Sequence, residues 1–228
     1  MPLPIYLAMT AAELRNHSVL PDHVAWMACH FSPYGTGLSN CPATLPPGSM
    51  LILNDRTPVY GHDPQRIAEQ MCELAAQLGC SRVLLDLQRP NEPATAAIAK
   101  AVSSVLPCPV AVSAWYAGEL TCPVLLPPVA LLKTPQEHLL PWKDREIWLE
   151  LARDTACYTI TEAGCRRETA VASGEFPHTD PALCCRYRIA EEENAVRFHI
   201  TQDQGLLLEQ LTKMDNVTCL VGLYQELG

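Results

Sequence analysis

Acidic residues of this chain stand where its predicted strands end. They are Asp55, Asp86, Glu150, Glu162 and Glu226, and each closes or follows an apolar segment. The carboxyl ends of parallel strands gather at one face of a barrel or an open α/β sheet, and active sites are built at that face. Carboxylates crowded together there raise one another's pKa, which is what a general acid requires. These residue types in this pattern therefore indicate acid–base chemistry.

Aromatic side chains accompany the acids. Trp115 and Tyr116 close one predicted strand, and Tyr224 follows another. Aromatic rings cover the apolar faces of sugars, while carboxyl groups hydrogen-bond sugar hydroxyls or protonate a glycosidic oxygen. We predict as catalytic residues Asp86, Glu150 and Glu162. We predict as ligand-binding residues Gln88, Asp55, His30, Tyr34, Trp115, Tyr116 and Tyr224.

A plainer interpretation of the same acids stays open. Acids at strand ends are also found solvated, capping the next helix or paired with cations. The candidate cations are Arg56, Arg89, Arg145 and Arg153. For Asp86 we favour a functional role, because a carboxylate at the end of a buried strand is costly unless it is paired or solvated.

Asp86 belongs to the stretch Gly79–Pro90, around which the rest of the chain is organised. A helical pattern over Asp63–Leu78 ends at Gly79, and an apolar run over Arg82–Leu87 follows. This order predicts a helix, a turn and a buried parallel strand. Side chains alternate along a strand, so we expect even-numbered residues 84 to 88 on one face and odd-numbered residues 83 to 87 on the other.

Strand and helix patterns alternate through the first half of the chain. The predicted strands are Val24–Phe31, Met50–Leu53, Arg82–Leu87 and Pro109–Tyr116. The predicted helices between them are Asp63–Leu78 and Glu92–Leu106. Strand–helix–strand units of this length are right-handed parallel crossovers, and they place this half in the α/β class.

The second half is less regular. We predict strands at Glu146–Ala152, Tyr158–Thr161 and Val217–Leu223, a helix at Gln202–Met214, and an antiparallel hairpin of Cys184–Ala190 with Ala195–Thr201. The fold class is α/β: a single domain over residues 1–228, an irregular, shortened TIM-type (β/α) barrel with a C-terminal β-hairpin insertion. The pattern leaves open whether residues 121–183 complete the barrel.

The net charge of the chain limits the classes of binding partner that we expect. The net charge is −9 over 228 residues. We therefore expect no nucleic-acid partner and no membrane partner, and a small-molecule or oligosaccharide ligand instead. Prolines interrupt the most apolar region, and the first ten residues lack the basic and apolar segments of a signal peptide. We accordingly expect a cytoplasmic protein.

Cysteine and histidine spacing gives no metal motif. The 11 cysteines and 7 histidines show no C-x-x-C, H-x-H or H-E-x-x-H spacing. Most cysteines fall inside apolar segments, where a free thiol behaves as a small hydrophobe, so we expect reduced thiols. We predict no cofactor and no metal site.

The stretch Gly-Cys-Ser-Arg-Val-Leu-Leu-Asp86-Leu-Gln88 resembles the fourth strand of family 18 glycoside hydrolases and their chitinase-like relatives. The resemblance extends over about Val24–Tyr116. It implies a TIM barrel whose strand carries a D-x-x-D-x-D-x-E type motif, with the final Glu as general acid of a substrate-assisted retaining mechanism. Asp86 matches the last Asp of the motif, whereas Gln88 stands at the position of the catalytic Glu. An amide does not titrate in the useful range, so Gln88 is no general acid.

These observations give one first expectation and two alternatives. The first is a carbohydrate-related, glycoside-hydrolase-like protein whose hydrolytic activity is lost or has passed to Glu150 or Glu162. The second is a non-catalytic binding or interaction protein that uses the barrel as a scaffold. The third is a metal-dependent enzyme using Asp55, Asp86 and His30. Whether the chain is an enzyme stays open at this point.

Overall fold

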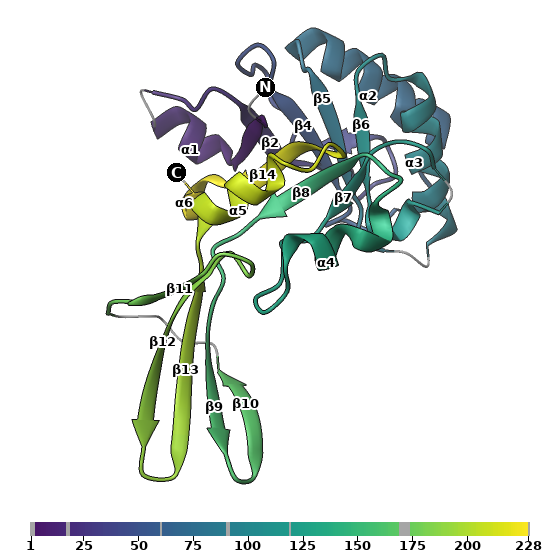
Figure 1. Cartoon of the computed structure of the whole chain (residues 1–228). Coiled ribbons are helices and arrows are strands. Elements are labelled where there is room, and N and C mark those ends of the chain that lie inside the picture. The colour runs from purple at the N-terminus through teal and green to yellow at the C-terminus, as the bar shows by residue number, and fades with distance from the viewer. Residues whose placement is uncertain are drawn as a thin grey trace.

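The sheet of the computed structural model closes into a barrel (Figure 1). The structure describes residues 3–16, 19–59, 61–89, 92–118, 120–168 and 174–227, so Pro90 of the predicted central stretch lies outside the described residues. Eight parallel strands follow one another around the barrel, and pairing of the first with the last closes it. In spatial order they are β1 (Ile5–Met9), β14 (Val217–Leu223), β8 (Ile147–Leu151), β7 (Val124–Leu126), β6 (Val110–Ser113), β5 (Arg82–Asp86), β4 (Met50–Asn54) and β2 (Val24–Phe31). The predicted TIM-type barrel is confirmed.

The helices outside the barrel are uneven in length. The α-helices are α1 (Ala11–Asn16), α2 (Pro64–Leu78), α3 (Pro93–Val105), α4 (Pro135–Leu139), α5 (Gln204–Leu211) and α6 (Tyr224–Leu227). Two 3-10 turns are η1 (Ala114–Tyr116) and η2 (Leu140–Trp142). Within the described residues, long crossover helices join only β4 to β5 and β5 to β6, with 15 and 13 residues. The barrel is therefore irregular, as the sequence predicts.

Helix α2 begins and ends where the sequence predicts. The Asp63 side chain accepts a hydrogen bond from the backbone N–H of Gln65, and Pro64 takes the first helical position. Gly79 ends the helix with φ 63°, a left-handed conformation that glycine adopts without steric cost. Ile67 and Met71 of the buried stripe pack against the outer face of the barrel strands. This packing fixes the strand that carries Asp86.

The barrel axis is filled by side chains. One core cluster takes residues from every barrel strand, including Tyr6, Leu84 and Trp148. At the amino-terminal end, the Arg82 guanidinium donates to the Tyr6 hydroxyl at 2.9 Å and lies over the Trp148 ring. Because this end is filled, open space within the barrel lies at the carboxyl ends of the strands.

The chain between β8 and α5 forms a second sheet, which projects from the barrel as an arm (Figure 1). Its antiparallel strands, in spatial order, are β10 (Gly164–Glu168), β9 (Thr155–Thr161), β13 (Ala195–Gln202), β12 (Cys185–Glu192) and β11 (His178–Asp180). The predicted hairpin is confirmed as β12 and β13. The expectation that Tyr158–Thr161 ends at the same face as the parallel strands was wrong, because β9 pairs antiparallel with β10 and β13.

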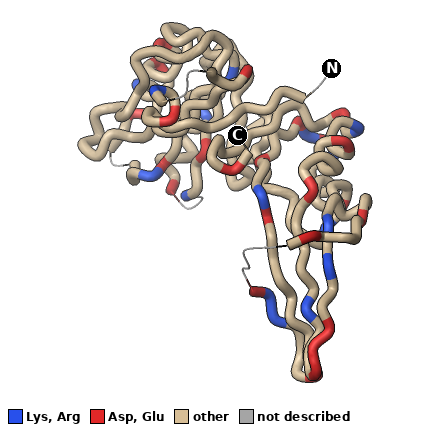
Figure 2. Tube along the Cα trace, turned by 90° about the vertical axis from the view of Figure 1, so that its left-hand side faces the viewer, with Lys and Arg blue, Asp and Glu red and all other residues tan. Residues whose placement is uncertain are grey.

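The region that the sequence left open divides between the two sheets. Strands β7 and β8 complete the barrel, and β9 leaves it to begin the arm. A small core at the base of the arm joins Leu131 to Ala156, Cys185 and Ile200. Farther out, the arm is a single layer with charges of both signs along it (Figure 2). A short strand β3 (Leu38–Ser39) pairs with the end of β2.

Candidate functional site

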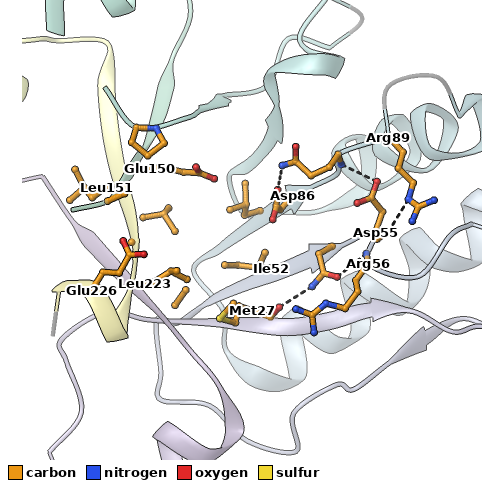
Figure 3. A pocket seen from close by; sticks show the side chains of 18 residues that line it. Met27, Ile52, Asp55, Arg56, Asp86, Arg89, Glu150, Leu151, Leu223 and Glu226 are labelled. Atoms are coloured by element: carbon orange, nitrogen blue, oxygen red, sulfur yellow. Dashed lines mark hydrogen bonds between the residues drawn. The ribbon is translucent and has the colours of Figure 1, made fainter. Parts of the chain in front are cut away.

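A cavity of about 750 Å³ opens at the carboxyl ends of the barrel strands. Its wall is formed by residues of β1, β2, β4, β5, β8 and β14 and by residues that follow β4, β5, β8 and β14 (Figure 3). The polar and charged residues in the wall are Asn54, Asp55, Arg56, Asp86, Gln88, Arg89, Glu150 and Glu226. The face at which the sequence predicts a site is therefore hollow, and polar and charged side chains share its wall with apolar ones.

Strand alternation places Asp86 in this cavity. Leu84, Asp86 and Gln88 line it, whereas Val83 and Leu85 pack outward against the helices. The predicted division of the two faces is confirmed. It follows from the period of two residues along a strand, which turns successive side chains to opposite faces.

Asp86 and Glu150 are two carboxyl groups of the cavity whose pKa values are both raised. Burial raises the pKa of Glu150 to about 7, and the charge of Asp86 adds to the rise. Burial likewise raises the pKa of Asp86, with a hydrogen bond from Gln88 opposing the rise and the charge of Asp55 adding to it. Figure 3 shows both carboxyl groups within the cavity, on different parts of its wall. Near pH 7, Glu150 can therefore both donate a proton and accept one.

Gln88 is held in place by its own hydrogen bonds. Its side-chain Nε2 donates to Asp86 Oδ1, and its Oε1 accepts from Trp115 Nε1 at 3.4 Å. Its backbone N–H donates to Asp55 Oδ2 at 2.9 Å. Gln88 thus fixes the orientation of the Asp86 carboxyl group. Asp55, which is only 4% exposed, fixes the backbone that follows β5.

Arginine residues bring positive charge to one side of the cavity. Figure 3 places Arg56 and Glu226 on opposite sides. Arg89 Nε donates to the Asp55 carbonyl oxygen at 3.2 Å, and Arg89 Nη1 pairs with Glu92 at 3.4 Å. From the sequence, we predict Arg56 and Arg89 only as possible ion-pair partners of the acids at the strand ends. Their positions just past β4 and β5 were the signal that could have placed them in the wall.

A second cavity of about 520 Å³ adjoins the first and shares Gln88 and Glu150 with it. Its wall is more aromatic, with Trp115, Trp142 and His138 among its residues. Trp115 is 64% exposed. Glu150 therefore lies where the first cavity meets a more aromatic one.

The remaining predicted site residues lie elsewhere. Tyr116 is buried in the core, and its hydroxyl donates to the Arg89 carbonyl oxygen at 2.6 Å. His30 Nδ1 lies 2.9 Å from the Phe31 carbonyl oxygen, in neither cavity wall. Tyr34 is 85% exposed in the loop after β2. Tyr224 begins α6, also outside both walls. Glu162 lies in the exposed turn between β9 and β10, at the far end of the arm.

The structure therefore brings together Asp86, Glu150, Gln88, Asp55 and Trp115. Among the described residues, no group of three or more His, Cys, Asp and Glu side chains has an arrangement suited to a metal ion. None of the helices in the described ranges has the length and apolarity needed to cross a bilayer.

Fold and cavity together define an irregular TIM-type α/β barrel with an acidic cavity at the carboxyl ends of its strands. Comparison of the chain with protein-family models, with curated proteins and with solved structures found no match. The barrel implied by the resemblance to family 18 glycoside hydrolases is present, and no family is identified.

Proposed function

We propose that the two adjoining cavities bind a carbohydrate and that Glu150 is the acid–base residue acting on it. The observation that carries this proposal is the position of Glu150. It belongs to both walls, and burial beside Asp86 raises its pKa to about 7. A glycosidase needs its acid between the two sugar units that it separates, and protonated at working pH.

The other residues suit the same ligand. Trp115 and Trp142 offer aromatic surfaces to a sugar ring in the second cavity. Asn54 and Arg56 offer polar groups to hydroxyls in the first. Protonated Glu150 would donate its proton to the glycosidic oxygen as the bond to the anomeric carbon breaks. Ionised Asp86 would stabilise the positive charge that develops on the sugar.

Gln88 stands where family 18 glycoside hydrolases have their catalytic Glu, so another residue must supply the acid. Either Glu150 or Glu162 could have taken the role of the acid that Gln88 cannot fill. Only Glu150 lines the cavities, while Glu162 lies in the turn at the far end of the arm. These positions support Glu150.

A thermal-shift screen with mono- and oligosaccharides, including N-acetylglucosamine oligomers, tests binding. Ligand at about 100 times its dissociation constant stabilises the folded state by roughly 2.7 kcal/mol, so weak binders are detected. We expect a shift that Asp86→Ala abolishes and that Glu162→Gln, the matched control in the arm, leaves intact. Absence of any shift on a cooperatively melting protein would remove the carbohydrate proposal.

Hydrolysis of aryl glycosides by the wild type tests catalysis separately. If Glu150 is the acid, kcat falls as the pH rises through about 7, and Glu150→Gln lowers kcat while sugar binding persists. Binding without hydrolysis would leave a sugar-binding protein whose hydrolytic chemistry has been lost.

The second candidate function is a non-catalytic interaction protein, and the arm favours it. Ile160, Ile189 and Val196 are 46%, 54% and 38% exposed, and they share one face of the arm. Among the described residues, β11 covers the edge of β12 only at Cys185–Tyr187. An open edge beside an exposed apolar face can pair with the same edge of a second copy across a two-fold axis.

Light scattering distinguishes this second candidate. A dimer in the wild type that becomes a monomer in Ile189→Lys supports self-association through the arm. A wild type that is monomeric over the whole concentration range removes that support.

A further inference from the structure

Two thiols lie against one another outside the cavities. The Sγ atoms of Cys29 and Cys41 are 3.8 Å apart. Cys29 is buried in β2, and Cys41 is exposed just beyond β3. All 11 cysteines lie within the described residues, and all are free thiols. This pair therefore combines an accessible thiol with a protected one in direct contact.

The backbone explains why these thiols meet. Strands β2 and β3 pair antiparallel, with His30 opposite Ser39. Continuing this pairing places Cys29 opposite Asn40, whose φ of 56° is left-handed and allows the chain to turn there. Cys41 follows directly. Cys41 thus lies one residue beyond the position opposite Cys29, and after the left-handed turn at Asn40 its Sγ atom is 3.8 Å from that of Cys29.

Hydrogen bonds already hold this part of the loop on the barrel. Asn40 Nδ2 donates to the Ala28 carbonyl oxygen at 3.0 Å, and Trp26 Nε1 donates to the Asn40 carbonyl oxygen at 3.1 Å. The sulfur atoms need to approach by only about 2 Å to reach bonding distance. Closing the bond is therefore a local adjustment of two side chains.

We propose that Cys29 and Cys41 form a reversible disulfide when the protein meets hydrogen peroxide, with Cys41 as the thiol that reacts first. This site is separate from the proposed carbohydrate site, and its test does not depend on it. The exposed thiol meets the oxidant, and the buried thiol resolves the product.

The chemistry balances with peroxide as the oxidant. The Cys41 thiolate attacks one peroxide oxygen, an S–O bond forms, and the O–O bond breaks. The departing hydroxide takes up the proton that the thiol released and becomes water. Cys29 then gives up its proton as its sulfur attacks the Cys41 sulfenic acid, so that the S–S bond forms and the S–O bond breaks. The second water leaves with the Cys29 proton. Two thiols lose two electrons together, and one peroxide is reduced to two waters.

The electrostatics support this order of reaction. The hydrogen bond from Cys29 lowers the pKa of Cys41 to about 7, against the opposing effect of burial. The same contact, together with burial, raises the pKa of Cys29 well above its ordinary range. Because the thiolate is the nucleophile, Cys41 is the thiol prepared to attack near neutral pH.

Peptide mapping of the full chain tests the proposal. The reduced protein is treated with hydrogen peroxide, alkylated under denaturing conditions and digested without reduction. We expect a peptide linking Cys29 to Cys41 and a fall in alkylatable thiols from 11 to 9, the 11 less the two that pair. Dithiothreitol should restore all of them. Cys41→Ser should abolish the loss, and Cys165→Ser, which removes an exposed thiol of the arm, should leave the linked pair unchanged.

A second variant checks the order of the two steps. In Cys29→Ala, the resolving thiol is absent, so dimedone should trap several-fold more sulfenic acid at Cys41 than in the wild type. The proposal is overturned if no thiol is lost, if Cys41 is recovered as sulfinic acid or bonded to another cysteine, or if Cys41→Ser still loses two thiols on treatment with peroxide.

Discussion

The barrel and the arm are both sheets, yet they give the same residue types opposite surroundings. Barrel strands are covered on both faces, by helices outside and by neighbouring side chains inside. The arm is a single layer, and much of both its faces meets solvent. Glu150 and Glu162 each stand near a strand end, but Glu150 is in a cavity and Glu162 is exposed in a turn. The comparison teaches that closure of the sheet, and not the strand end itself, makes a carboxyl group chemically unusual.

Matched isoleucine substitutions should show the largest contrast in stability. Ile98 of α3 is 0% exposed against the barrel, whereas Ile160 of the arm is 46% exposed. Ile98→Ala leaves a cavity in a close-packed core and should lower the free energy of unfolding by about 3 kcal/mol. Ile160→Ala removes less buried surface and should cost below about 1 kcal/mol. Urea denaturation measures both, and equal costs would show that the face of the arm is covered in solution.

The two acids should differ in how they couple stability to pH. The folded-state pKa of Glu150 is about 7, above its ordinary value of 4.5. As the pH rises through this window, the unfolded chain releases the proton first, so the free energy of unfolding falls. Glu150→Gln removes this loss. The variant should match the wild type near pH 4 and exceed its stability near pH 8 by about 3 kcal/mol.

Glu162→Gln is the control for that experiment. Its side chain is exposed at the turn of the arm, so its unfolding curves should superimpose on those of the wild type at both pH values. If Glu150→Gln also shows no gain at high pH, the Glu150 carboxyl group is solvated in the folded protein and the proposed acid loses its support.

The barrel could be predicted well from the sequence because helix ends and strand faces are specified by residues close together in the chain. Asp63 and Gly79 mark the ends of α2, and alternation around Asp86 decides which side chains face the axis. Glu162 shows where local signals fail. The segment before it, β9, has the composition of a barrel strand, but it pairs with β10 and β13 of the arm. The sequence of a single strand does not specify which distant strand it will pair with.

The candidate site shows the same division. The strand-end rule correctly indicated the face that holds the cavity, and it placed Asp86 and Glu150 there together. It did not predict that Tyr116 turns into the core. The chain enters the 3-10 turn η1 after Ser113, and this ends the alternation on which the prediction for Tyr116 rested. Side-chain direction past the last strand residue depends on the connection, and a single strand pattern carries no information about it.

The smallest contrast concerns polar contacts at the surface of each region. Asp63 caps α2, because its side chain accepts a hydrogen bond from the backbone N–H of Gln65 at 3.0 Å. In the arm, Glu192 forms an ion pair with Arg197 at 3.1 Å, and the side chains of this pair are each about half exposed. The cap satisfies a backbone N–H that has no partner within the helix, so Asp63→Ala should cost about 1 kcal/mol. The ion pair replaces contacts that water supplies almost as well, so Glu192→Ala should cost at most about 0.5 kcal/mol and less in high salt. Urea denaturation at low and high salt measures both. A larger cost for Glu192→Ala that high salt does not reduce would mean that the ion pair is shielded from water, as it would be if a second copy covered the arm.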